Sequence, residues 1–402
     1  ALTTPGSPSR STSSTGCYAP GAGFPPPELA GRDDIVERAG IALDRVKVGR
    51  AARSFIFYGL RGVGKTVLLN KIRLEAEARG FATVEIEAPE DRSLPGLLAA
   101  PLRATLLRLS RGEAARAALA SALRALRSFV DSFKVKYQDV EVGLDFEPDK
   151  GIADSGDLEA DLADLFAAVG RAAAERHTAV VLSLDELQYV PKEHLAALIF
   201  AFHRLSQRQS PVTMIAAGLP QLVGQMGRAK SYAERLFEFA AIDRLDPPAA
   251  RAALCKPAER EGVAYAEDAV AEILRQTQGY PYFLQEWGKH GWNLADRSPV
   301  TRSDADRATA SALAELDAGF FRVRFDRLTP TEKRYMRAMA ELGPGPHRSG
   351  DIAEKLSRKV TSVAPIRNSL IAKGMVFSAS HGDIQFTVPL FDGFLKRTIP
   401  VF

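Results

Sequence analysis

The segment FYGLRGVGKTVLL, residues 57–69, constrains the fold of this chain more than any other stretch. An apolar strand leads into a glycine-rich loop, and the loop leads through a lysine and a threonine into a helix. The helix is expected to run from Lys65 to about Arg79, and a second apolar strand is expected at 82–88. Strand, helix and strand in this order predict an α/β fold with a parallel sheet.

The loop has the composition of a phosphate cradle. Its pattern G-x-x-x-x-G-K-[ST] is made by Gly59, Gly64, Lys65 and Thr66. Glycines let backbone N–H groups turn towards phosphate oxygens, and the start of the helix adds its dipole. Lys65 is expected to reach the β- and γ-phosphates of a nucleotide, and the Thr66 hydroxyl to bind Mg²⁺. The predicted nucleotide-binding residues of the loop are Gly59, Leu60, Arg61, Gly62, Val63, Gly64, Lys65, Thr66 and Val67.

Two acids form a second candidate site. Asp185 and Glu186 come directly after the apolar run 180–184. Ligands bind at the carboxyl ends of parallel strands, so Asp185 is expected to hold Mg²⁺ through its water shell. Glu186 is expected to orient or deprotonate a water aimed at the γ-phosphate, which favours hydrolysis over transfer to a metabolite. The alternative is that both acids merely cap the following helix.

The remaining pattern predicts further strands and an insertion. Apolar strands are expected at 178–190, 211–218 and 237–245. Residues 95–130 have helical periodicity and Phe133–Phe146 alternates like a hairpin, so an insertion is expected near 95–150. Residues 1–27 are rich in Ser, Thr, Gly and Pro, and we expect them to be disordered because they bury too little apolar surface.

Composition excludes several classes of protein. The 402 residues suggest two or three domains, and a net charge of +4 is too small over this length to indicate a nucleic-acid binder by itself. The two cysteines are far apart and match neither a disulfide framework nor a zinc site, which fits a reducing compartment. No apolar run reaches membrane length and no secretory h-region precedes the first strand. These features predict a cytoplasmic protein without a membrane partner.

Taken together, these motifs resemble the AAA+ and STAND branches of P-loop ATPases, near the origin-recognition-like and archaeal-type ATPases. The matching pieces are AGRDD, GLRGVGKT, VVLSLDELQ, AAGLPQL, YAERLFEF and GYPYFLQ. The resemblance implies a five-stranded parallel sheet, a helical lid and a C-terminal winged helix, with ATP bound between sheet and lid and often at a subunit boundary. The implied domains are a P-loop core at 28–245, a lid at 246–322 and a winged-helix domain at 323–402.

The resemblance also implies roles for residues outside the loop. Arg235 matches an arginine finger that reaches a neighbouring subunit's γ-phosphate, with Arg228 as a weaker candidate; the alternative for Arg235 is an ion pair with Glu234 or Glu238. Pro281, after Gly279 and Tyr280, resembles the STAND lid proline that packs on adenine, and it also fits a plain helix boundary. Ala217 and Gly218 stand where relatives carry a polar sensor residue, which favours a slow switch over fast turnover.

The last 80 residues predict a helical unit with a strand pair. Thr329, Pro330 and Glu332 form a strong helix start, further helices are expected at 351–356 and 362–373, and two strands at 375–388. This resembles a winged helix-turn-helix. The candidates for DNA contact are Arg358, Lys359, Asn368 and Lys373. The alternative is a packing domain that senses the nucleotide state or docks a partner.

The sequence therefore predicts an AAA+/STAND-type ATPase that uses ATP and Mg²⁺, with Lys65, Glu186 and Arg235 as catalytic residues. Nucleotide state would be coupled to the lid and the winged helix, in a DNA-associated, signalling or defence assembly that self-associates through its nucleotide interface. The alternative is a non-catalytic switch that keeps ATP bound and docks another protein.

Overall fold

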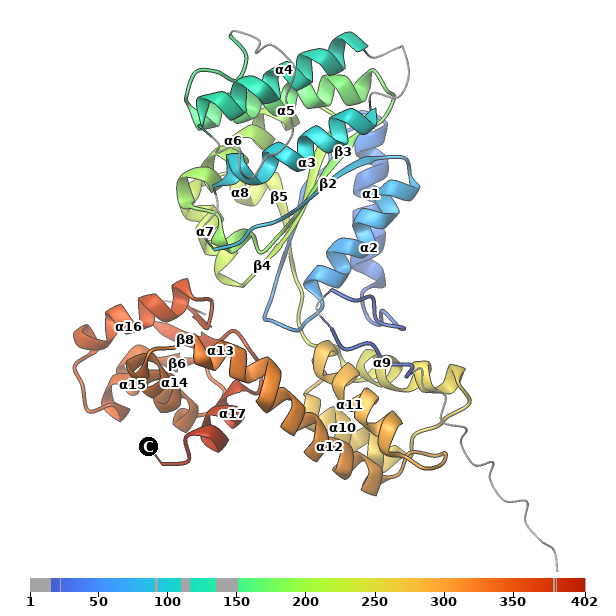
Figure 1. The fold of residues 1–402 in the computed structure, drawn as a ribbon, viewed down its shortest axis with the longest axis vertical. Coiled ribbons are helices and arrows are strands. Elements are labelled where there is room, and N and C mark those ends of the chain that lie inside the picture. The colour runs from blue at the N-terminus through green and yellow to red at the C-terminus, as the bar shows by residue number, and fades with distance from the viewer. Residues whose placement is uncertain are drawn as a thin grey trace, which may run out of the picture. The chain divides into compact units, whose positions relative to one another are not determined.

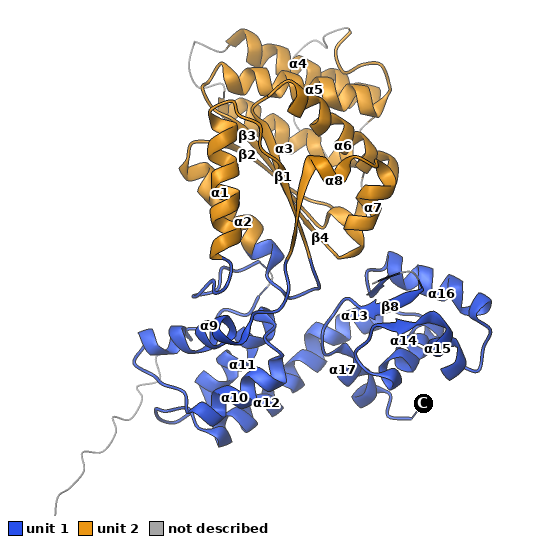
Figure 2. Ribbon diagram, turned by 180° about the vertical axis from the view of Figure 1, so that it is seen from behind, with its two compact units in different colours: residues 1–32, 59–67, 242–402 blue, residues 33–58, 68–241 orange. Residues whose placement is uncertain are grey.

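The computed structural model describes residues 16–21, 23–90, 93–109, 116–134, 151–378, 380 and 382–401 (Figure 1). The chain divides into two compact units, coloured separately in Figure 2. The sheet unit consists of residues 33–58 and the described parts of 68–241. The helical unit consists of residues 59–67 and the described parts of 1–32 and 242–402, so the phosphate loop belongs to it.

The sheet unit contains a five-stranded parallel sheet in the order β2-β3-β4-β1-β5. Its strands are β1 (Ser54–Tyr58), β2 (Ala82–Glu87), β3 (Val180–Asp185), β4 (Val212–Gly218) and β5 (Phe237–Ala241). β4 is buried along its whole length and β3 up to Asp185, as expected for parallel strands covered on both faces. The predicted α/β fold and its five parallel strands are thus confirmed.

Helices surround this sheet and supply most of its core. They are α1 (Asp33–Lys47), α2 (Lys65–Ala78), α3 (Leu94–Leu109), α4 (Arg116–Ser132), α5 (Leu158–Ala174), α6 (Lys192–Gln207), α7 (Gln221–Ala229) and the single turn α8 (Ala233–Leu236). α3 and α4 lie where the helical insertion was predicted, and both bury leucines and alanines in the same core as the sheet. Most of the predicted hairpin Phe133–Phe146 lies outside the described residues.

The helical unit begins with four helices that we call the lid helices: α9 (Pro247–Arg260), α10 (Glu267–Thr277), α11 (Pro281–Leu294) and α12 (Arg302–Leu316). A π-type turn, η3 (Asp317–Phe321), and α13 (Arg322–Asp326) continue the chain. Phe283 of α11 and Phe321 of η3 pack in one aromatic cluster with Phe391 and Phe394. One hydrophobic core therefore contains residues from both sides of the predicted domain boundary between 322 and 323.

The C-terminal part contains the elements that the sequence predicts, together with one strand and one helix that it does not predict. It comprises α14 (Pro330–Leu342), the unpredicted β6 (His347–Arg348), α15 (Ser349–Lys355), α16 (Val360–Ala372), β7 (Val376–Phe377), β8 (Asp383–Phe386) and the unpredicted α17 (Phe391–Thr398). The short strands form an antiparallel sheet in the order β6-β8-β7. α14 starts at the predicted capping box, in which the Thr329 hydroxyl accepts from Glu332 N–H at 3.3 Å and the Glu332 carboxylate accepts from Thr329 N–H at 2.8 Å.

The segment predicted to be disordered is anchored at Tyr18. The Tyr18 side chain is buried, and its hydroxyl lies 2.5 Å from the Leu254 carbonyl and 3.0 Å from the Tyr265 hydroxyl. A Cβ on Gly288 of α11 would overlap the tyrosine ring, so this glycine makes room for it. The prediction of disorder is therefore wrong at Tyr18, because one aromatic ring buries enough surface on the lid helices to hold a polar segment in place.

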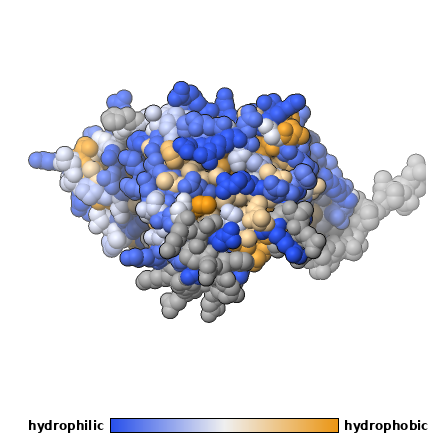
Figure 3. All heavy atoms as spheres, turned by 90° about the horizontal axis from the view of Figure 1, so that it is seen from above, coloured by the Kyte–Doolittle hydropathy of each residue, from blue (hydrophilic) through white to orange (hydrophobic). Residues whose placement is uncertain are grey.

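The surface and the helix lengths are those of an ordinary globular chain. Figure 3 shows a face that is mainly hydrophilic with hydrophobic residues in between. Within the described residues, no helix combines the length and the apolar character needed to cross a membrane.

Candidate nucleotide site

The phosphate loop has a backbone that only glycine allows at key positions. Gly62 and Gly64 have φ values of 80° and 89°, in the left-handed region that disfavours side chains. Gly59 has no room for a side chain, because a Cβ there would overlap the carbonyl oxygen of Ile242. The loop follows β1 directly, and α2 begins at Lys65 as predicted. The glycine spacing in the sequence is thus explained by the local geometry.

Lys65 is folded onto the loop itself. Its ammonium group donates to the carbonyl oxygens of Gly59 at 3.0 Å and Leu60 at 2.8 Å, and the residue is 8% exposed. Both of these partners are neutral backbone dipoles. A positive group held in this way inside a loop is well placed to attract an anion.

The loop backbone is bonded to distant parts of the helical unit. Tyr282 of α11 donates its N–H to the Gly62 carbonyl at 3.1 Å, and Arg61 donates its N–H to the Thr387 carbonyl at 2.9 Å. Thr387 is fully buried and its own hydroxyl bonds to backbone carbonyls within the C-terminal part. One side of the loop therefore contacts a lid helix and the other contacts the C-terminal part.

Arg32 adds a third support to the loop. Its guanidinium group donates to the Val63 carbonyl at 3.3 Å and also to the Asp243 carbonyl. Val63 itself is fully buried. The RDD stretch noted in the sequence thus contributes its arginine to the backbone of the loop.

The two acids lie at the carboxyl edge of the sheet. Tyr58 pairs with Gly218, and Leu184 pairs with Ala216, so β1, β4 and β3 all end at this edge. Asp185 is the last residue of β3, and its Oδ1 accepts from Glu186 N–H at 2.8 Å. Tyr58 is the residue immediately before the phosphate loop.

Glu186 has an unusual backbone conformation. Its φ and ψ are 53° and 36°, a left-handed conformation that is uncommon for residues with a side chain and frequent at functional sites. The next helix, α6, begins at Lys192 behind Pro191 and has no side-chain cap. Glu186 is instead the N-cap residue of the short 3₁₀ turn Leu187–Tyr189 that precedes α6.

Sequence reasoning missed Gln188, which lies in the short 3₁₀ turn η2 (Leu187–Tyr189). Its side-chain amide donates to the Glu186 carboxylate and accepts from Leu219 N–H at 2.9 Å. Leu219 directly follows β4, where the sequence offers only Ala217 and Gly218. The motif DELQ contained the signal, but nothing in the local pattern indicated that this glutamine reaches the end of another strand.

Arg235 is exposed in α8 and Arg228 is exposed near the end of α7. Glu238, one of the two suggested partners of Arg235, forms an ion pair with Arg38 at 3.4 Å. Among the residues that the structure describes, Arg235 forms no ion pair of its own, so the alternative of a surface ion pair is wrong within this part of the chain.

Pro281 is the first residue of α11, and Gly279 before it has a φ of 75°. Gly279 also accepts from Leu245 N–H at 2.9 Å, and a Cβ on it would lie 2.6 Å from the Leu245 carbonyl oxygen. The helix-boundary interpretation is thus present in the structure. Contact with adenine stays a prediction.

The four DNA-contact candidates are in different environments. Arg358, Lys359 and Asn368 are exposed. Lys373 is instead bound to the buried carboxylate of Glu332 at 2.7 Å and to the Arg327 carbonyl at 3.2 Å. The expectation that Lys373 is available for phosphate is therefore wrong in this conformation, because a buried carboxylate holds its ammonium group.

Glu332 is the centre of a small polar network. It also accepts from the Ser369 hydroxyl at 2.7 Å, in addition to Lys373 and the Thr329 backbone. Burial would raise the pKa of Glu332, but these hydrogen bonds lower it to about 2. The hydroxyl of Ser369 thereby connects α16 to α14.

A second charged cluster joins α11 and α12. Single ligand-type atoms of Glu286, His290 and Glu315 lie within 4.8 Å of one another. The Lys289 ammonium lies between the two carboxylates, 2.8 Å from Glu286 and 2.6 Å from Glu315. This lysine already supplies the positive charge that the cluster needs.

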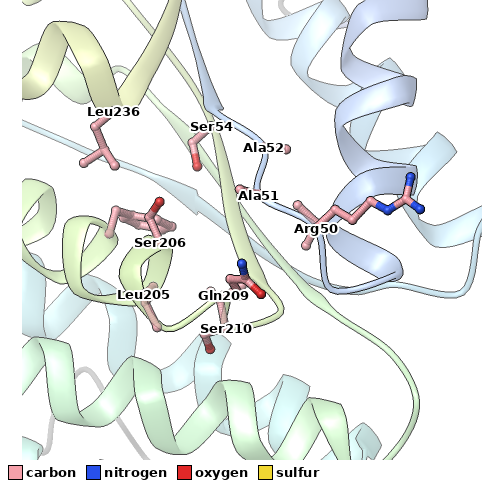
Figure 4. Close-up of a pocket in the computed structure, with 12 residues that line it drawn as sticks. Arg50, Ala51, Ala52, Ser54, Leu205, Ser206, Gln209, Ser210 and Leu236 are labelled. Atoms are coloured by element: carbon pink, nitrogen blue, oxygen red, sulfur yellow. The ribbon is translucent and has the colours of Figure 1, made fainter.

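A small cavity lies at the opposite edge of the sheet. It has a volume of about 40 Å³ and is lined by Ser54 at the start of β1 and by Ser210 before β4, with Arg50 and Gln209 at its rim (Figure 4). A nucleotide needs a pocket of several hundred Å³. This cavity is therefore no candidate for the site that the loop predicts.

Comparison with known proteins gives a family match for part of the chain and a shared fold. Residues 28–215 match the AAA ATPase domain family, and residues 318–395 match a domain of unknown function, DUF8462. No curated protein matches the chain. The Walker-type ATPase PABY2304 of Pyrococcus abyssi is similar in structure, with a TM-score of 0.58 and 17% identity over 92% of this chain and 96% of that one. This similarity shows a shared fold.

Two further solved structures are more distant. The Aeropyrum pernix ORC1 protein in complex with DNA has a TM-score of 0.46 and 17% identity, covering 92% of this chain and 94% of that one. The Thermotoga maritima RuvB Holliday junction branch migration motor has a TM-score of 0.43 and 14% identity, covering 89% and 92%. At these scores neither likeness carries an argument about this chain.

Proposed function

We propose that the chain hydrolyses ATP and couples its nucleotide state to the lid helices and the C-terminal part, a proposal that starts from the match of residues 28–215 to the AAA ATPase domain family. ATP would be the substrate and Mg²⁺ the cofactor. The bound metal supplies charge neutralisation for the transferred phosphoryl group. The proposal divides the work between the phosphate loop and the acids that follow β3.

The residues present fit this chemistry. The glycine backbone at Gly62 and Gly64 and the closed position at Gly59 make a cradle that side chains would fill. Lys65 would leave the loop carbonyls and bind the β- and γ-phosphates. The Thr66 hydroxyl and the Asp185 carboxylate are hard oxygen ligands of the kind that Mg²⁺ prefers. Glu186 would orient the attacking water and take its proton.

The observation that carries the coupling is the double attachment of the loop. Arg61 N–H and the Gly62 carbonyl are used by Thr387 and Tyr282, at 2.9 and 3.1 Å. Phosphate binding requires loop N–H groups to face the ligand. Any rotation of these peptide groups towards a phosphate would therefore weaken one or both bonds. Loss or gain of a nucleotide would in this way shift the equilibrium between lid and C-terminal positions.

We also propose that residues 323–402 form a winged-helix domain, and that Arg235 acts on the nucleotide of a neighbouring copy. Three helices followed by the β7–β8 pair support the first proposal. The exposed guanidinium of Arg235, without an ion pair in the described residues, supports the second. Arg358 and Lys359 would give weak DNA contact of little sequence preference, because both would touch phosphates only.

A second candidate function is a non-catalytic switch that keeps ATP bound and docks a protein. It is favoured by Ala217 and Gly218, which bring no polar side chain to the end of β4. The two candidates differ in whether bound ATP is consumed.

ATP turnover of the wild-type chain and of Glu186→Gln, with and without duplex DNA, separates them. We expect the variant to bind ATP as tightly as the wild type and to hydrolyse it at least about 100-fold more slowly, the usual loss of a general base. Lys192→Gln, an exposed change at the start of α6, is the matched control and should turn over normally. If the wild type shows no turnover, hydrolysis is excluded and the docking switch remains; if Glu186→Gln turns over at the wild-type rate, the general base is another residue.

A further inference from the structure

We propose that Gln188 is a positioning residue that holds the Glu186 carboxylate against the backbone at the end of β4, in place of a polar side chain from that strand. The inference rests on the proposed hydrolysis, because it assigns a partner to the proposed general base. It concerns residues of the sheet unit alone.

The hydrogen bonds fix which way the Gln188 amide faces. Leu219 contributes a backbone N–H, which is a donor, so the side-chain atom 2.9 Å away must be the amide oxygen. The NH₂ group must then face Glu186, whose carboxylate accepts from it. If the amide were turned over, its NH₂ group would face the Leu219 N–H and its oxygen would face the Glu186 carboxylate, and neither pair could form a hydrogen bond. One side chain therefore links the acid after β3 to the peptide after β4.

Gly218 is the reason that the link fits. A Cβ on Gly218 would lie 2.8 Å from the Gln188 amide oxygen and 2.7 Å from Cδ2 of Leu222. Both distances are shorter than real side chains tolerate, so a larger residue at this position would displace the amide. The small residue at the end of β4 and the glutamine after β3 are thus two parts of one arrangement.

The surroundings keep Gln188 in place. The residue is 6% exposed, and its carbonyl accepts from the Gln225 side chain of α7 at 3.4 Å. A buried amide bonded to a carboxylate makes a charge-assisted hydrogen bond, which is stronger than a neutral one. The left-handed backbone of Glu186 and the hydrogen bond from this amide both contribute to the direction of its carboxylate.

A positioning role predicts a specific kinetic pattern. Misplacing a general base by about 1 Å can cost about 100-fold in rate without weakening substrate binding. Gln188→Ala should therefore lower kcat by about 10- to 100-fold and leave the affinity for ATP unchanged. A purely structural role would instead lower the melting temperature and leave kcat per folded molecule as in the wild type.

The short distance between Gly218 and the Gln188 amide allows a rescue experiment. In the Gln188→Ala background, Gly218→Ser places a hydroxyl in the space that the amide has left, and Gly218→Ala fills the same space without a polar group. We expect the serine to recover at least about fivefold in kcat and the alanine to recover nothing. In the wild-type background both changes should reduce kcat, because both displace the amide. Gly218→Ser would thus raise kcat in the Gln188→Ala background and lower it in the wild-type background, which indicates direct coupling between the two positions.

Gln188→Glu provides a second measurement that keeps the length of the side chain. It replaces the donating amide by a carboxylate, which repels the carboxylate of Glu186 and cannot position it. We expect kcat to fall by at least about 10-fold, and Gln225→Glu, on the other side of the turn, to lower it less.

If the wild type hydrolyses ATP and Gln188→Ala has the same kcat, the positioning role of Gln188 is wrong, while the proposed hydrolysis stands. Equal rescue by serine and alanine, or an unchanged kcat in Gln188→Glu, would also contradict the positioning role. A wild-type chain that binds ATP but shows no turnover would overturn the proposed hydrolysis, and the positioning role with it. If Gln188→Ala does not fold, the kcat of Gln188→Glu and of the two Gly218 single variants decides the matter.

Discussion

Removing the Lys373 ammonium should destabilise the C-terminal part by about 1 to 3 kcal/mol at pH 7. Lys373→Met keeps the length of the side chain but leaves the Glu332 carboxylate, whose side chain is only 5% exposed, without its cation. The pKa of Glu332 is about 2 in the folded chain, against an ordinary value of 4.5. At about 1.36 kcal/mol for each pH unit, this gap corresponds to about 3 kcal/mol, which Lys373 shares with the hydrogen bonds from Ser369 and Thr329.

The pH dependence has a definite direction. A lowered pKa in the folded state contributes stability above pH 4.5, and this contribution is lost as the pH falls from 4.5 towards 2. In Lys373→Met burial is offset only by the hydrogen bonds from Ser369 and Thr329, so the pKa of Glu332 should rise and the loss of stability between pH 4.5 and 2 should become smaller. The variant and the wild type should therefore differ most near neutral pH and converge in acid.

Hydrogen exchange of the full chain, followed on peptides from α14 and α16 between pH 3 and 7, measures this difference locally. Lys359→Met, which removes an exposed lysine at the start of α16, is the matched control and should change the opening free energy by less than about 0.5 kcal/mol. If Lys373→Met behaves like this control at pH 7, or if its difference from the wild type grows in acid, the ion pair does not stabilise this region and the reasoning is refuted.

Three further predictions concern the nucleotide and DNA. Lys65→Ala should weaken ATP binding severely, and unchanged affinity in calorimetry would contradict the assignment of the phosphate loop. The rate of ATP hydrolysis per chain should rise with protein concentration. Mixing Arg235→Ala with Glu186→Gln should partly restore activity, because each variant supplies the residue that the other lacks. A rate per chain that does not change with concentration, in a protein that stays monomeric with ATP bound, would exclude action between copies. Affinity for random duplex DNA should fall as the salt concentration rises. Replacing Arg358 and Lys359 with Ala should make the plot of log affinity against log salt concentration less steep by about 1.8, as expected for the loss of two phosphate contacts. If the wild type binds no DNA at low salt, the proposal of DNA contact is wrong.

Local chemistry explains why much of the fold and the phosphate loop could be predicted. The spacing from Gly59 to Thr66 reflects a backbone that only glycine permits, and the Thr329–Glu332 capping box depends on residues three apart. Apolar runs such as 180–184 and 212–216 could be identified as buried strands because both faces of a parallel sheet are covered. Such features depend on neighbours in the sequence, so the sequence displays them directly.

The features that could not be predicted depend on pairs of residues far apart in the chain. Gln188 and Leu219 are 31 residues apart, and Glu332 and Lys373 are 41 apart. Each partner alone has an ordinary local interpretation: Gln188 as a turn residue, and Lys373 as a surface cation at a helix end. Only the packing of β3 beside β4, and of α14 beside α16, brings the partners together.

The burial of Tyr18 has a practical consequence for measuring motion in solution. The tyrosine is hydrogen-bonded to Leu254 and Tyr265 and rests against Gly288, all within the lid helices or the loops that join them. A spectroscopic probe placed beside this residue will therefore travel with the lid helices rather than with the sheet. Paired with a second probe on an exposed position of α4, such as Arg116, it would form a distance ruler between the two units and would report their rearrangement without any label near the phosphate loop.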